Sequence, residues 1–476
     1  MIRGACLLPF ALLTACSLQP TYKRPAPAVP VAWPAGEAYP QPGDAALPSL
    51  SYRDIFRDPQ LQTIIDQALA NNQDLRLAVA NIAAARAQYH VTQAALFPVI
   101  DASGRVSTEN GSNRVRSSSA GGSNSGSGTD TSYGADIGTT AFEIDLFGRL
   151  RNQSSAAFAE YMGTAAAVRA ARLTLIGEVA RAYLQYATDK SLLAIATDTI
   201  ANAGRNVELT RARLQGGVAP RTDLRQAETI LAQARSDEAS FTTAVAQDRN
   251  ALELLVGAPV ADALLPASLE SIDGLLQPVP AGLDSGILLR RPDVVQAEYQ
   301  LRAANARIGA ARAAFFPRLA LTAAAGFASS GLSSLFSGGA FAWSVQPSAT
   351  LPIFDAGANI GNLKYANAQR TAAIAVYQKA IQTAFREVAD ALARQGTIDR
   401  QLAADQQLND ATEDSLTLSR ARYNEGIDSY LATLDAQRSF YSARRTLITT
   451  RLIRAQNLAT LYQALGGDQL ISEGRM

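Results

Sequence analysis

Histidine and cysteine are almost absent from this chain of 476 residues. It has 1 histidine, His90, and 2 cysteines, Cys6 and Cys16. Zinc sites and acid–base clusters are assembled from several such side chains, so neither is expected here. The sequence also lacks a nucleophile motif and a phosphate-binding loop. We therefore expect no catalytic residue, no metal site, no cofactor and no enzymatic activity.

Long apolar runs and an excess of one charge are missing as well. Beyond the N-terminal segment, no stretch has the ~18 uninterrupted apolar residues of a transmembrane helix. If the chain crosses a membrane, only a closed β-barrel would satisfy its backbone hydrogen bonds. The formal net charge is +1, which provides no basic surface for nucleic acid.

Proline is absent after Pro352, over about 120 residues, although a proline in a helix interior would break the helix. This run predicts two long helices, at about 357–424 and 429–465. The first would be roughly 100 Å long. Between them, Gly426 suits the left-handed position that ends a helix, while Asp428 and Ser429 suit the cap of the next one. Such helices are typical of coiled coils and helical barrels.

The N-terminus predicts export from the cytoplasm. A basic residue, Arg3, precedes a short apolar stretch that ends in Leu13-Thr14-Ala15-Cys16. These four residues resemble a bacterial lipobox, which implies cleavage before Cys16, acylation of its thiol and, with Ser17 following, sorting to the outer membrane. An ordinary signal peptide is the alternative. Cleavage leaves a single cysteine, so no intrachain disulfide is expected. The proline-rich residues that follow predict an extended tether.

The rest of the chain predicts one structural unit used twice, each copy containing a helix, two strands joined by a Ser/Gly-rich loop, and two further helices. Strands are expected near 100–107, 133–147, 319–327 and 341–353, with loops at 117–134 and 329–339. The sequence Phe97-Pro98 parallels Phe316-Pro317, and residues 211–217 parallel 420–426. The predicted parts are a signal peptide (1–15), an acylated tether (16–58), a first repeat (59–256), a connector (257–283), a second repeat (284–467) and a tail (468–476).

The expected strands alternate apolar and polar residues, as strands with one greasy face do. Four strands cannot close a barrel, because about eight are needed to fill the smallest one. We therefore expect copies to associate, with a trimer of about twelve strands as the smallest ring that leaves a lumen. The expected lipid-facing residues are Phe341, Trp343, Val345 and Leu351, with Leu319 and Leu321. The expected lumen residues are Asp101, Ser103, Arg105, Ser344, Gln346, Ser348 and Thr350. A soluble β-sandwich with one wet face is the alternative.

Several sequence segments, taken in order, resemble the TolC/OprM-type outer-membrane efflux channels of the lipoprotein branch. They are the lipobox, the two Phe-Pro junctions, residues 351–357, 422–426 and 430–438, and the terminal 461–467. The resemblance covers nearly all of the mature chain. It implies a mixed fold, mostly α-helical with a transmembrane β-barrel: a homotrimer whose four strands per chain share one barrel that continues into a long α-helical barrel. It also implies a periplasmic membrane-fusion adaptor and an inner-membrane RND transporter as partners.

In such channels the tips of the helical hairpins close the periplasmic end. By position, the resemblance assigns this aperture to Thr222, Asp223, Tyr423, Asp428, Leu431, Asp435 and Arg438. Leu431, Asp435 and Arg438 also share one helix face by their spacing. Three copies of Leu431 would form an apolar plug, and three of Asp435 an acidic ring that favours cations. Helix capping by Thr222, Asp223, Asp428 and Ser429, and an ordinary surface pair between Asp435 and Arg438, are the alternatives.

Two other functions remain open from the residues. A structural coiled-coil lipoprotein without a pore would need no lipid-facing row of side chains, so the clean alternation around Trp343 favours a channel. A type I secretion-like channel for polypeptides would use the same fold. The main expectation is a passive exit duct for drugs or other small toxic compounds, closed at its periplasmic tip until the adaptor and pump engage it.

Overall fold

The structure of the chain is a computed structural model that describes residues 17–40, 51–110, 129–272 and 284–467. The expected signal peptide, the acylation site Cys16, most of the first Ser/Gly-rich loop, part of the connector and the C-terminal tail lie outside the described residues. Contacts divide the chain into two compact units. Unit 1 contains all the strands and takes residues 84–162 and 299–375 with the N-terminal stretch up to Arg24. Unit 2 takes residues 25–83, 163–298 and the chain from 376 onward.

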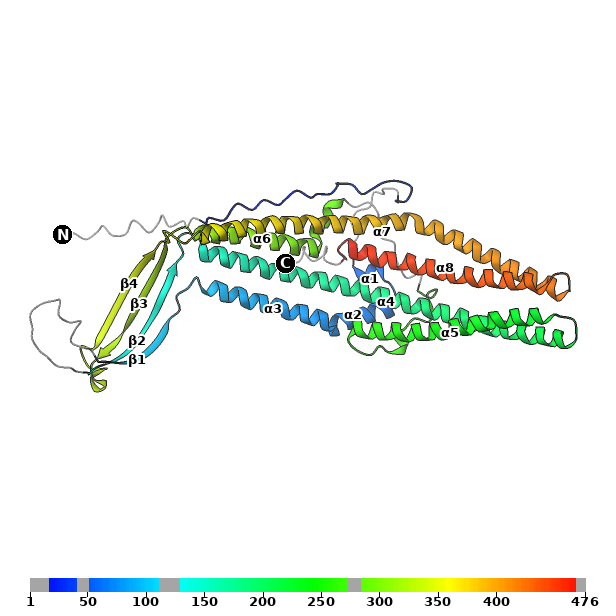
Figure 1. Ribbon diagram of the computed structural model, residues 1–476, viewed down its shortest axis with the longest axis horizontal. Coiled ribbons are helices and arrows are strands. Elements are labelled where there is room, and N and C mark those ends of the chain that lie inside the picture. The colour runs from blue at the N-terminus through cyan, green and yellow to red at the C-terminus, as the bar shows by residue number, and fades with distance from the viewer. Residues whose placement is uncertain (1–16, 41–50, 111–128, 273–283, 468–476) are drawn as a thin grey trace, which may run out of the picture. The chain divides into compact units, whose positions relative to one another are not determined.

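The described residues are mostly helical, with one group of strands (Figure 1). The α-helices are α1 (Tyr52–Ile55), α2 (Pro59–Asn71), α3 (Gln73–Ala94), α4 (Arg149–Gln215), α5 (Arg221–Val256), α6 (Pro292–Ala313), α7 (Ala358–Asn424) and α8 (Tyr430–Ala464). The strands are β1 (Asp101–Asn110), β2 (Thr129–Ile144), β3 (Arg318–Ser329) and β4 (Phe341–Thr350). Short 3₁₀ turns are η2 (Asp262–Leu264), η4 (Ser285–Arg290) and η5 (Leu332–Ser334). No helix among these combines the length and apolar character that crossing a membrane requires.

Helix lengths repeat between the two halves of the sequence. Helices α4 and α7 have 67 residues each, α3 and α6 have 22 each, and α5 and α8 have 36 and 35. At 1.5 Å per residue, α4 and α7 are each about 100 Å long, as the missing prolines predict for α7. The correspondence supports the predicted internal duplication.

The two longest helices also begin in the same way. Gly148 and Gly357 have φ angles of 76° and 86°, a left-handed conformation that favours glycine. Upstream of each glycine, an aspartate accepts backbone N–H groups of the first helical turn: Asp145 from Arg151 at 2.9 Å, and Asp355 from Asn359 at 2.9 Å. Since free N–H groups at a helix start need an acceptor, these carboxylates fix where α4 and α7 begin.

In unit 1 the four strands form one antiparallel sheet in the order β1-β2-β3-β4. The predicted number of strands is confirmed for the described residues, but four boundaries differ by three residues or more. Strand β1 continues to Asn110, three residues past its predicted end. Strand β2 starts at Thr129, so residues 129–134 of the expected loop are strand. It ends at Ile144, three residues before the predicted end. Strand β4 ends at Thr350, so Leu351 and Ile353 follow the sheet instead of belonging to it.

The core of unit 2 lies where α1, α2, α4, α7 and α8 meet. Its largest fully buried side chains include Phe56, Tyr183, Tyr377 and Tyr462. The Tyr183 hydroxyl donates to Asp58 Oδ2 at 2.7 Å, and Asp58 also caps α2 by accepting from the Gln60 backbone N–H. Burial and this hydrogen bond raise the pKa of Tyr183. Because the buried hydroxyl has its acceptor, a polar group can lie in this core without an unpaired atom.

The N-terminal stretch of unit 2 is extended, as its prolines predict, but it lies against helices. Trp33 stacks on Phe385 of α7 with ring centroids 5.0 Å apart. Arg400 of the same helix donates to the Glu37 carbonyl at 3.0 Å. Gly396 lies between these two contacts, and a Cβ there would overlap the Ala38 carbonyl. The absent side chain therefore lets this stretch cross α7 at close range.

Two carboxyl groups face each other between α4 and α5. Burial, the hydrogen bond to Asp189 and the charge of Asp189 together raise the pKa of Asp248 to about 7. Asp248 Oδ2 is buried without a hydrogen-bond donor among the described residues, whereas Asp189 accepts from the Gln185 amide at 3.0 Å. The pair is therefore most stable when it shares a proton.

This pair predicts a pH dependence of stability. The folded pKa of Asp248 lies above its unfolded value, so folding binds a proton between about pH 4 and pH 7, and stability falls as pH rises through that window. Asp248→Asn should remove the dependence and increase the free energy of unfolding at pH 8 by on the order of 1 kcal/mol after discounting for solvent screening, which raises the melting temperature. Circular dichroism melts from pH 5 to pH 8 measure it. Asp198→Asn, an exposed change on α4, is the control and should leave the pH slope as it is. An unchanged slope in Asp248→Asn would contradict the shared proton.

Candidate functional site

One face of the sheet carries the polar side chains. The register pairs Asp101 with Gly138, Ser103 with Asp136, and Arg105 with Gly134, so these residues share a face. Ser103 donates to Asp136 Oδ2 at 3.1 Å. Gly326 of β3 lies opposite Asp136, and a Cβ there would come 2.7 Å from the Asp136 Cβ. The glycine leaves room for the carboxylate in a shallow hollow of about 660 Å³.

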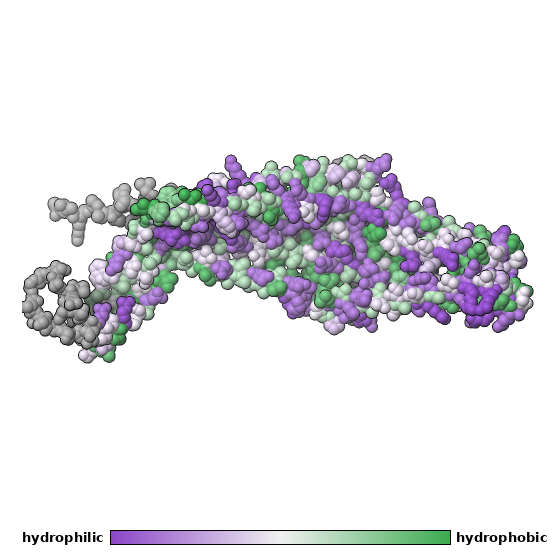
Figure 2. All heavy atoms as spheres, viewed as in Figure 1, coloured by the Kyte–Doolittle hydropathy of each residue, from purple (hydrophilic) through white to green (hydrophobic). Residues whose placement is uncertain are grey.

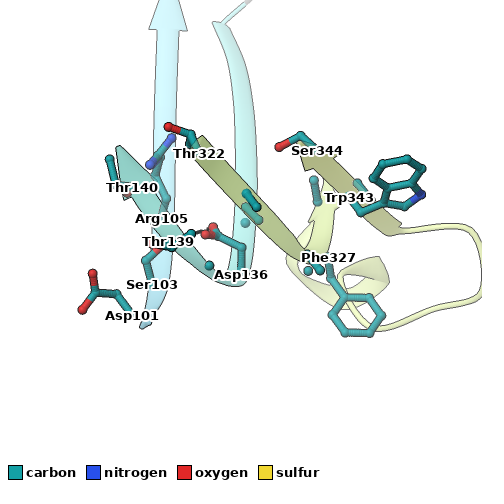
Figure 3. A pocket seen from close by; sticks show the side chains of 18 of the residues that line it. Asp101, Ser103, Arg105, Asp136, Thr139, Thr140, Thr322, Phe327, Trp343 and Ser344 are labelled. Atoms are coloured by element: carbon teal, nitrogen blue, oxygen red, sulfur yellow. Dashed lines mark hydrogen bonds between the residues drawn. The ribbon is translucent and has the colours of Figure 1, made fainter. Parts of the chain in front are cut away.

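The predicted lumen residues lie on this polar face. Strand β4 contributes Ser344, Gln346, Ser348 and Thr350, which pair with Ala324, Thr322, Ala320 and Arg318 of β3. Figure 3 shows Asp101, Ser103 and Arg105 along β1 with Asp136 beside them, while the Trp343 ring points away from them. The charged groups of the face therefore lie on β1, on β2 and, with Arg318, at the start of β3, whereas β4 contributes only neutral side chains.

The opposite face is apolar. Phe341, Trp343 and Val345 follow one another on this face of β4, each more than half exposed at 61%, 70% and 54%. Their neighbours on β3 are Phe327, Ala325 and Ala323. Phe327 contacts Phe341 and Phe336 edge to face, with centroids 5.9 and 5.5 Å apart. Water contact with so much apolar area is unfavourable, so the face needs a covering surface.

The helix–strand junctions of unit 1 combine aromatic and charged residues. Phe147 stacks on Phe316 with centroids 4.7 Å apart. Arg149 forms a two-pronged ion pair with Glu143 at 2.7 and 2.5 Å. Beyond β4, Ile353 and Phe354 are 94% and 89% exposed, and Figure 2 shows hydrophobic residues (green) at this start of α7. Aromatic rings thus lie at both ends of the sheet, with ion pairs at the helical end.

The two hairpin turns of unit 2, between α4 and α5 and between α7 and α8, have the same geometry. Gly217 and Gly426 have φ angles of 74° and 73°. The next residues, Val218 and Ile427, donate backwards to the Arg213 and Arg422 carbonyls at 2.9 Å each. This is the glycine-terminated helix end that the sequence predicts for Gly426. It leaves Val218 and Ile427, both apolar, 71% and 62% exposed at the turns.

The expected caps of the following helices are not found. The N-cap residues are Pro220 for α5 and Ser429 for α8, and neither makes a side-chain capping hydrogen bond. Asp428 instead accepts from Arg422 at 2.6 and 3.0 Å across the turn. The Arg422 guanidinium holds the pKa of Asp428 below its usual value. The prediction of capping by Asp428 and Ser429 is therefore wrong, because the carboxylate binds the stronger, charged donor.

The proposed aperture residues fall into two groups. Tyr423 is buried, at 8% exposure, in an apolar cluster that also holds Tyr430 and Leu434. The others lie at or near the surface, and Leu431 is 49% exposed. The side chains of Asp435 and Arg438 are 65% and 55% exposed, and their ion pair is long, at 4.0 Å. Leu431, Asp435 and Arg438 thus form one uncovered stripe on α8. Thr222 and Asp223 lie apart from it, in the first turn of α5.

The two hairpins pack against each other behind this stripe. The apolar cluster joins Val207, Leu224 and Ile230 of the first hairpin to Tyr423, Tyr430 and Leu434 of the second. Arg213 lies over the Tyr423 ring at 4.5 Å. Farther along, the Tyr441 hydroxyl donates to Asp237 Oδ2 at 2.7 Å, and Arg445 lies 3.5 Å from the same oxygen. Burial and the bond to Asp237 raise the pKa of Tyr441.

Sequence reasoning missed Asp136 and the links between hairpins. Ser132, Asp136 and Gly138 alternate with Tyr133 and Ile137, a period-two signal that the flanking Ser/Gly-rich residues obscure. The pairing of Tyr441 with Asp237 joins residues 204 positions apart, and no local pattern reports it. Within the described residues, no three His, Cys, Asp or Glu side chains are placed to hold a metal ion.

Comparison with known proteins agrees with this architecture. The sequence matches the outer membrane efflux protein family over residues 64–258 and 284–467. The chain therefore belongs to the outer membrane efflux protein family.

Two relatives and one solved structure give this membership more detail. The chain is 42% identical to the solvent efflux pump outer membrane protein SrpC of Pseudomonas putida, over 98% of each chain. It is also 42% identical to the antibiotic efflux pump outer membrane protein ArpC of Pseudomonas putida, over 96% of this chain and 93% of the relative. The open state of the Neisseria gonorrhoeae MtrE outer membrane channel superposes with a TM-score of 0.84, at 36% identity, over 95% of this chain and 99% of that one.

Proposed function

We propose that three copies of this chain form the exit channel of an efflux pump in the bacterial outer membrane. The two-faced sheet with open edges is the observation that carries the proposal. Within the described residues, strands β1 and β4 each have a neighbour on one side only. Edge-to-edge association of three sheets gives about twelve strands, enough for a closed barrel with a lumen. The polar face with Asp101, Arg105 and Asp136 lines the lumen, and the face with Trp343 and Val345 contacts lipid.

Strand length and the distribution of aromatic residues support this placement. Strands β1, β3 and β4 have 10, 12 and 10 residues, close to the ~9–11 of a tilted membrane strand. Aromatic girdles at both interfaces are usual for barrels in lipid, and Phe341 with Phe327 and Phe147 with Phe316 mark the two levels. Leu351, just after β4, lies near the inner level.

The helices have the same need for neighbours. Helix α3 has no buried residue within its own chain. Its apolar side chains Leu77 and Val91 are 61% and 66% exposed. Burial of these side chains by another copy makes a ring of helices, the helical barrel below the membrane. The family matches at 64–258 and 284–467 fit a first repeat at 59–256 and a second at 284–467, joined by the connector 257–283.

The hairpin ends form the periplasmic aperture. In this proposal the uncovered stripe of Leu431, Asp435 and Arg438 faces the other two copies and closes the duct. Thr222, Asp223 and the Arg422–Asp428 pair shape the turns around it. Opening moves one hairpin against the other, so it must loosen the Tyr423 cluster and the Tyr441–Asp237 bond.

The partners and cargo follow from the same arrangement. The exposed Val218 and Ile427 at the turns offer apolar contacts to a periplasmic membrane-fusion adaptor, which links the duct to an inner-membrane RND transporter. The names of SrpC and ArpC support organic solvents and antibiotics as the exported compounds. They favour small toxic compounds over polypeptides, the secretion alternative. Acylation at Cys16 anchors each copy to the outer-membrane lipid.

Two arginine substitutions on adjacent residues of β4 test the proposal. Val345→Arg puts a charge on the face assigned to lipid, at a cost of ~2–4 kcal/mol per chain. It should prevent heat-stable trimers in the outer-membrane fraction and abolish solvent tolerance in a strain that lacks its own outer-membrane efflux component. Ser344→Arg is the matched control on the lumen face and should still assemble. Equal behaviour of the two variants would contradict a lipid-facing sheet and favour a coiled-coil lipoprotein without a pore.

A further inference from the structure

The first described residues of the chain lie against two buried asparagines of unit 1. Asn152, in the first turn of α4, is 2% exposed, and Asn305 of α6 is fully buried. The Ser17 hydroxyl donates to Asn152 Oδ1 at 3.0 Å, and Asn305 Nδ2 donates to the Pro20 carbonyl at 2.7 Å. Both contacts fix the chain direction, because each uses a different residue of the segment.

A glycine lets the segment approach this closely. Gly309 lies on α6 one turn after Asn305, and a Cβ there would meet the Gln19 Cα at 2.8 Å and overlap the Asn152 amide. Gly309 has no positive φ that would require glycine, so space is the physical reason for it. Farther along, Arg302 lies over the Tyr22 ring at 5.1 Å.

The same two asparagines have unused hydrogen-bonding atoms. Asn152 Nδ2 and Asn305 Oδ1 are buried and have no partner among the described residues. A buried amide atom left unpaired costs ~1–3 kcal/mol, so an occupant with both an acceptor and a donor is favoured here.

The site lies close in sequence to the helix–strand junctions of unit 1. Asn152 follows the Gly148 junction by one helical turn, and Gly309 precedes the Phe316-Pro317 junction by two. These junctions carry the stacked Phe147 and Phe316 that the proposed function places at the inner membrane surface. By contrast, a flexible tether of residues 16–58 would have an r.m.s. end-to-end distance of ~35 Å, so its acylated end would have no fixed position.

We propose that Asn152, Asn305 and Gly309 form a seat for residues 17–22 that fixes the depth at which the acylated Cys16 enters the outer membrane. The acyl chains then enter the membrane at the level of the strand ends, because the segment that carries them is docked and not free. The depth in the membrane that we assign to the seat depends on the proposed function. The docking itself rests only on contacts within unit 1.

Spin labels test the seat in the full-length, acylated trimer. The thiol of Cys16 is blocked by lipid, so Thr21→Cys and Gln153→Cys provide the only free thiols of the mature chain. Thr21 is an exposed residue of the docked segment and makes none of the contacts named above. Labelled chains diluted with unlabelled ones should give a narrow distance distribution. Adding Gly309→Leu should broaden it to tens of ångströms. Gly361→Leu, on α7 with nothing within 4 Å of its Cβ, is the matched control and should keep it narrow. Asn305→Ala removes the hydrogen bond to Pro20 without adding bulk, and it should broaden the distribution partly.

Accessibility of the position-21 label to oxygen and to a water-soluble nickel chelate gives its depth. The label should lie at the membrane surface in the parent and leave that depth in Gly309→Leu. A broad distribution in the parent, or an equally narrow one in Gly309→Leu, overturns the seat. Conductance of the same sample separates the two proposals. A conducting pore whose N-terminal segment is undocked would contradict the proposed seat alone. A docked segment in a protein that forms no pore would contradict the proposed channel alone.

Discussion

Replacing Leu431 and Asp435 together by alanine is expected to raise the conductance of the reconstituted channel several-fold and to weaken its preference for cations. In one chain Leu431 is 49% exposed and the Asp435 side chain 65% exposed, so their loss should disturb the fold little. In the proposed trimer these two side chains belong to the uncovered stripe of α8 that faces the other two copies. If the stripe closes the duct as proposed, removing three leucines should open the apolar constriction, and removing three carboxylates should remove the charge that attracts cations.

Single-channel recording in planar bilayers measures both effects, the current at fixed voltage and the reversal potential across a salt gradient. The control is Leu408→Ala with Asp390→Ala on α7. Leu408 is 50% exposed, and Asp390 forms an equally long ion pair with Arg386, at 4.0 Å. The control therefore removes the same chemistry at the same exposure away from the turns. Its conductance and selectivity should match those of the parent.

The single variants separate the contribution of each residue to conductance from its contribution to ion selectivity. Asp435→Ala alone should change selectivity more than conductance, and Leu431→Ala alone the reverse. If the double variant kept the parent's current and cation preference, the stripe of Leu431, Asp435 and Arg438 would not be the constriction. The cluster around Tyr423, which links the hairpins inside one chain, would then be the next place to look for the barrier.

The extent to which the sequence predicts this fold depends on how local the signals are. The ends of α7 are clear because Gly357 precedes the helix and Gly426 follows it, and both have the left-handed conformation that glycine favours. The predicted start of β2 was wrong because its first four residues, 129–132, are Thr, Asp, Thr and Ser, which are all polar and give no apolar–polar alternation. The end of β4 was placed too far along, because Leu351 and Ile353 continue the apolar alternation after the strand has ended.

The candidate site was predictable only in part, for a related reason. Spacing alone places Leu431, Asp435 and Arg438 on one face, and the structure shows that stripe uncovered. Spacing does not show what a charged residue at a turn will bind. Asp428 was expected to cap α8, but Arg422, six residues earlier, provides a charged two-pronged donor and captures it. Contacts between distant segments, such as Ser17 with Asn152, have no sequence signature at all.

Arg291 is a buried charge of unit 2 that links α6 to α7 and α8, and its loss is expected to lower stability substantially. It is 7% exposed at the start of α6. It donates to the Ala464 carbonyl at the end of α8 at 2.7 Å, to both oxygens of Asp293, and to Glu387 of α7 at 2.8 Å. Burial disfavours its charge, but Asp293 and Glu387 outweigh that effect and raise the pKa of Arg291.

Arg291→Met should therefore destabilise the protein by about 3 kcal/mol per chain, because it leaves two carboxylates and a helix-terminal carbonyl without their donor. Lysine cannot replace the forked guanidinium, so Arg291→Lys should recover only part of the loss. The melting of helical signal and the temperature at which trimers dissociate on unboiled gels measure the effect. Arg290→Met, at the exposed neighbouring position, is the control and should change neither. An Arg291→Met protein as stable as its control would mean that α6, α7 and α8 are held together by apolar packing alone, with the ion network adding nothing.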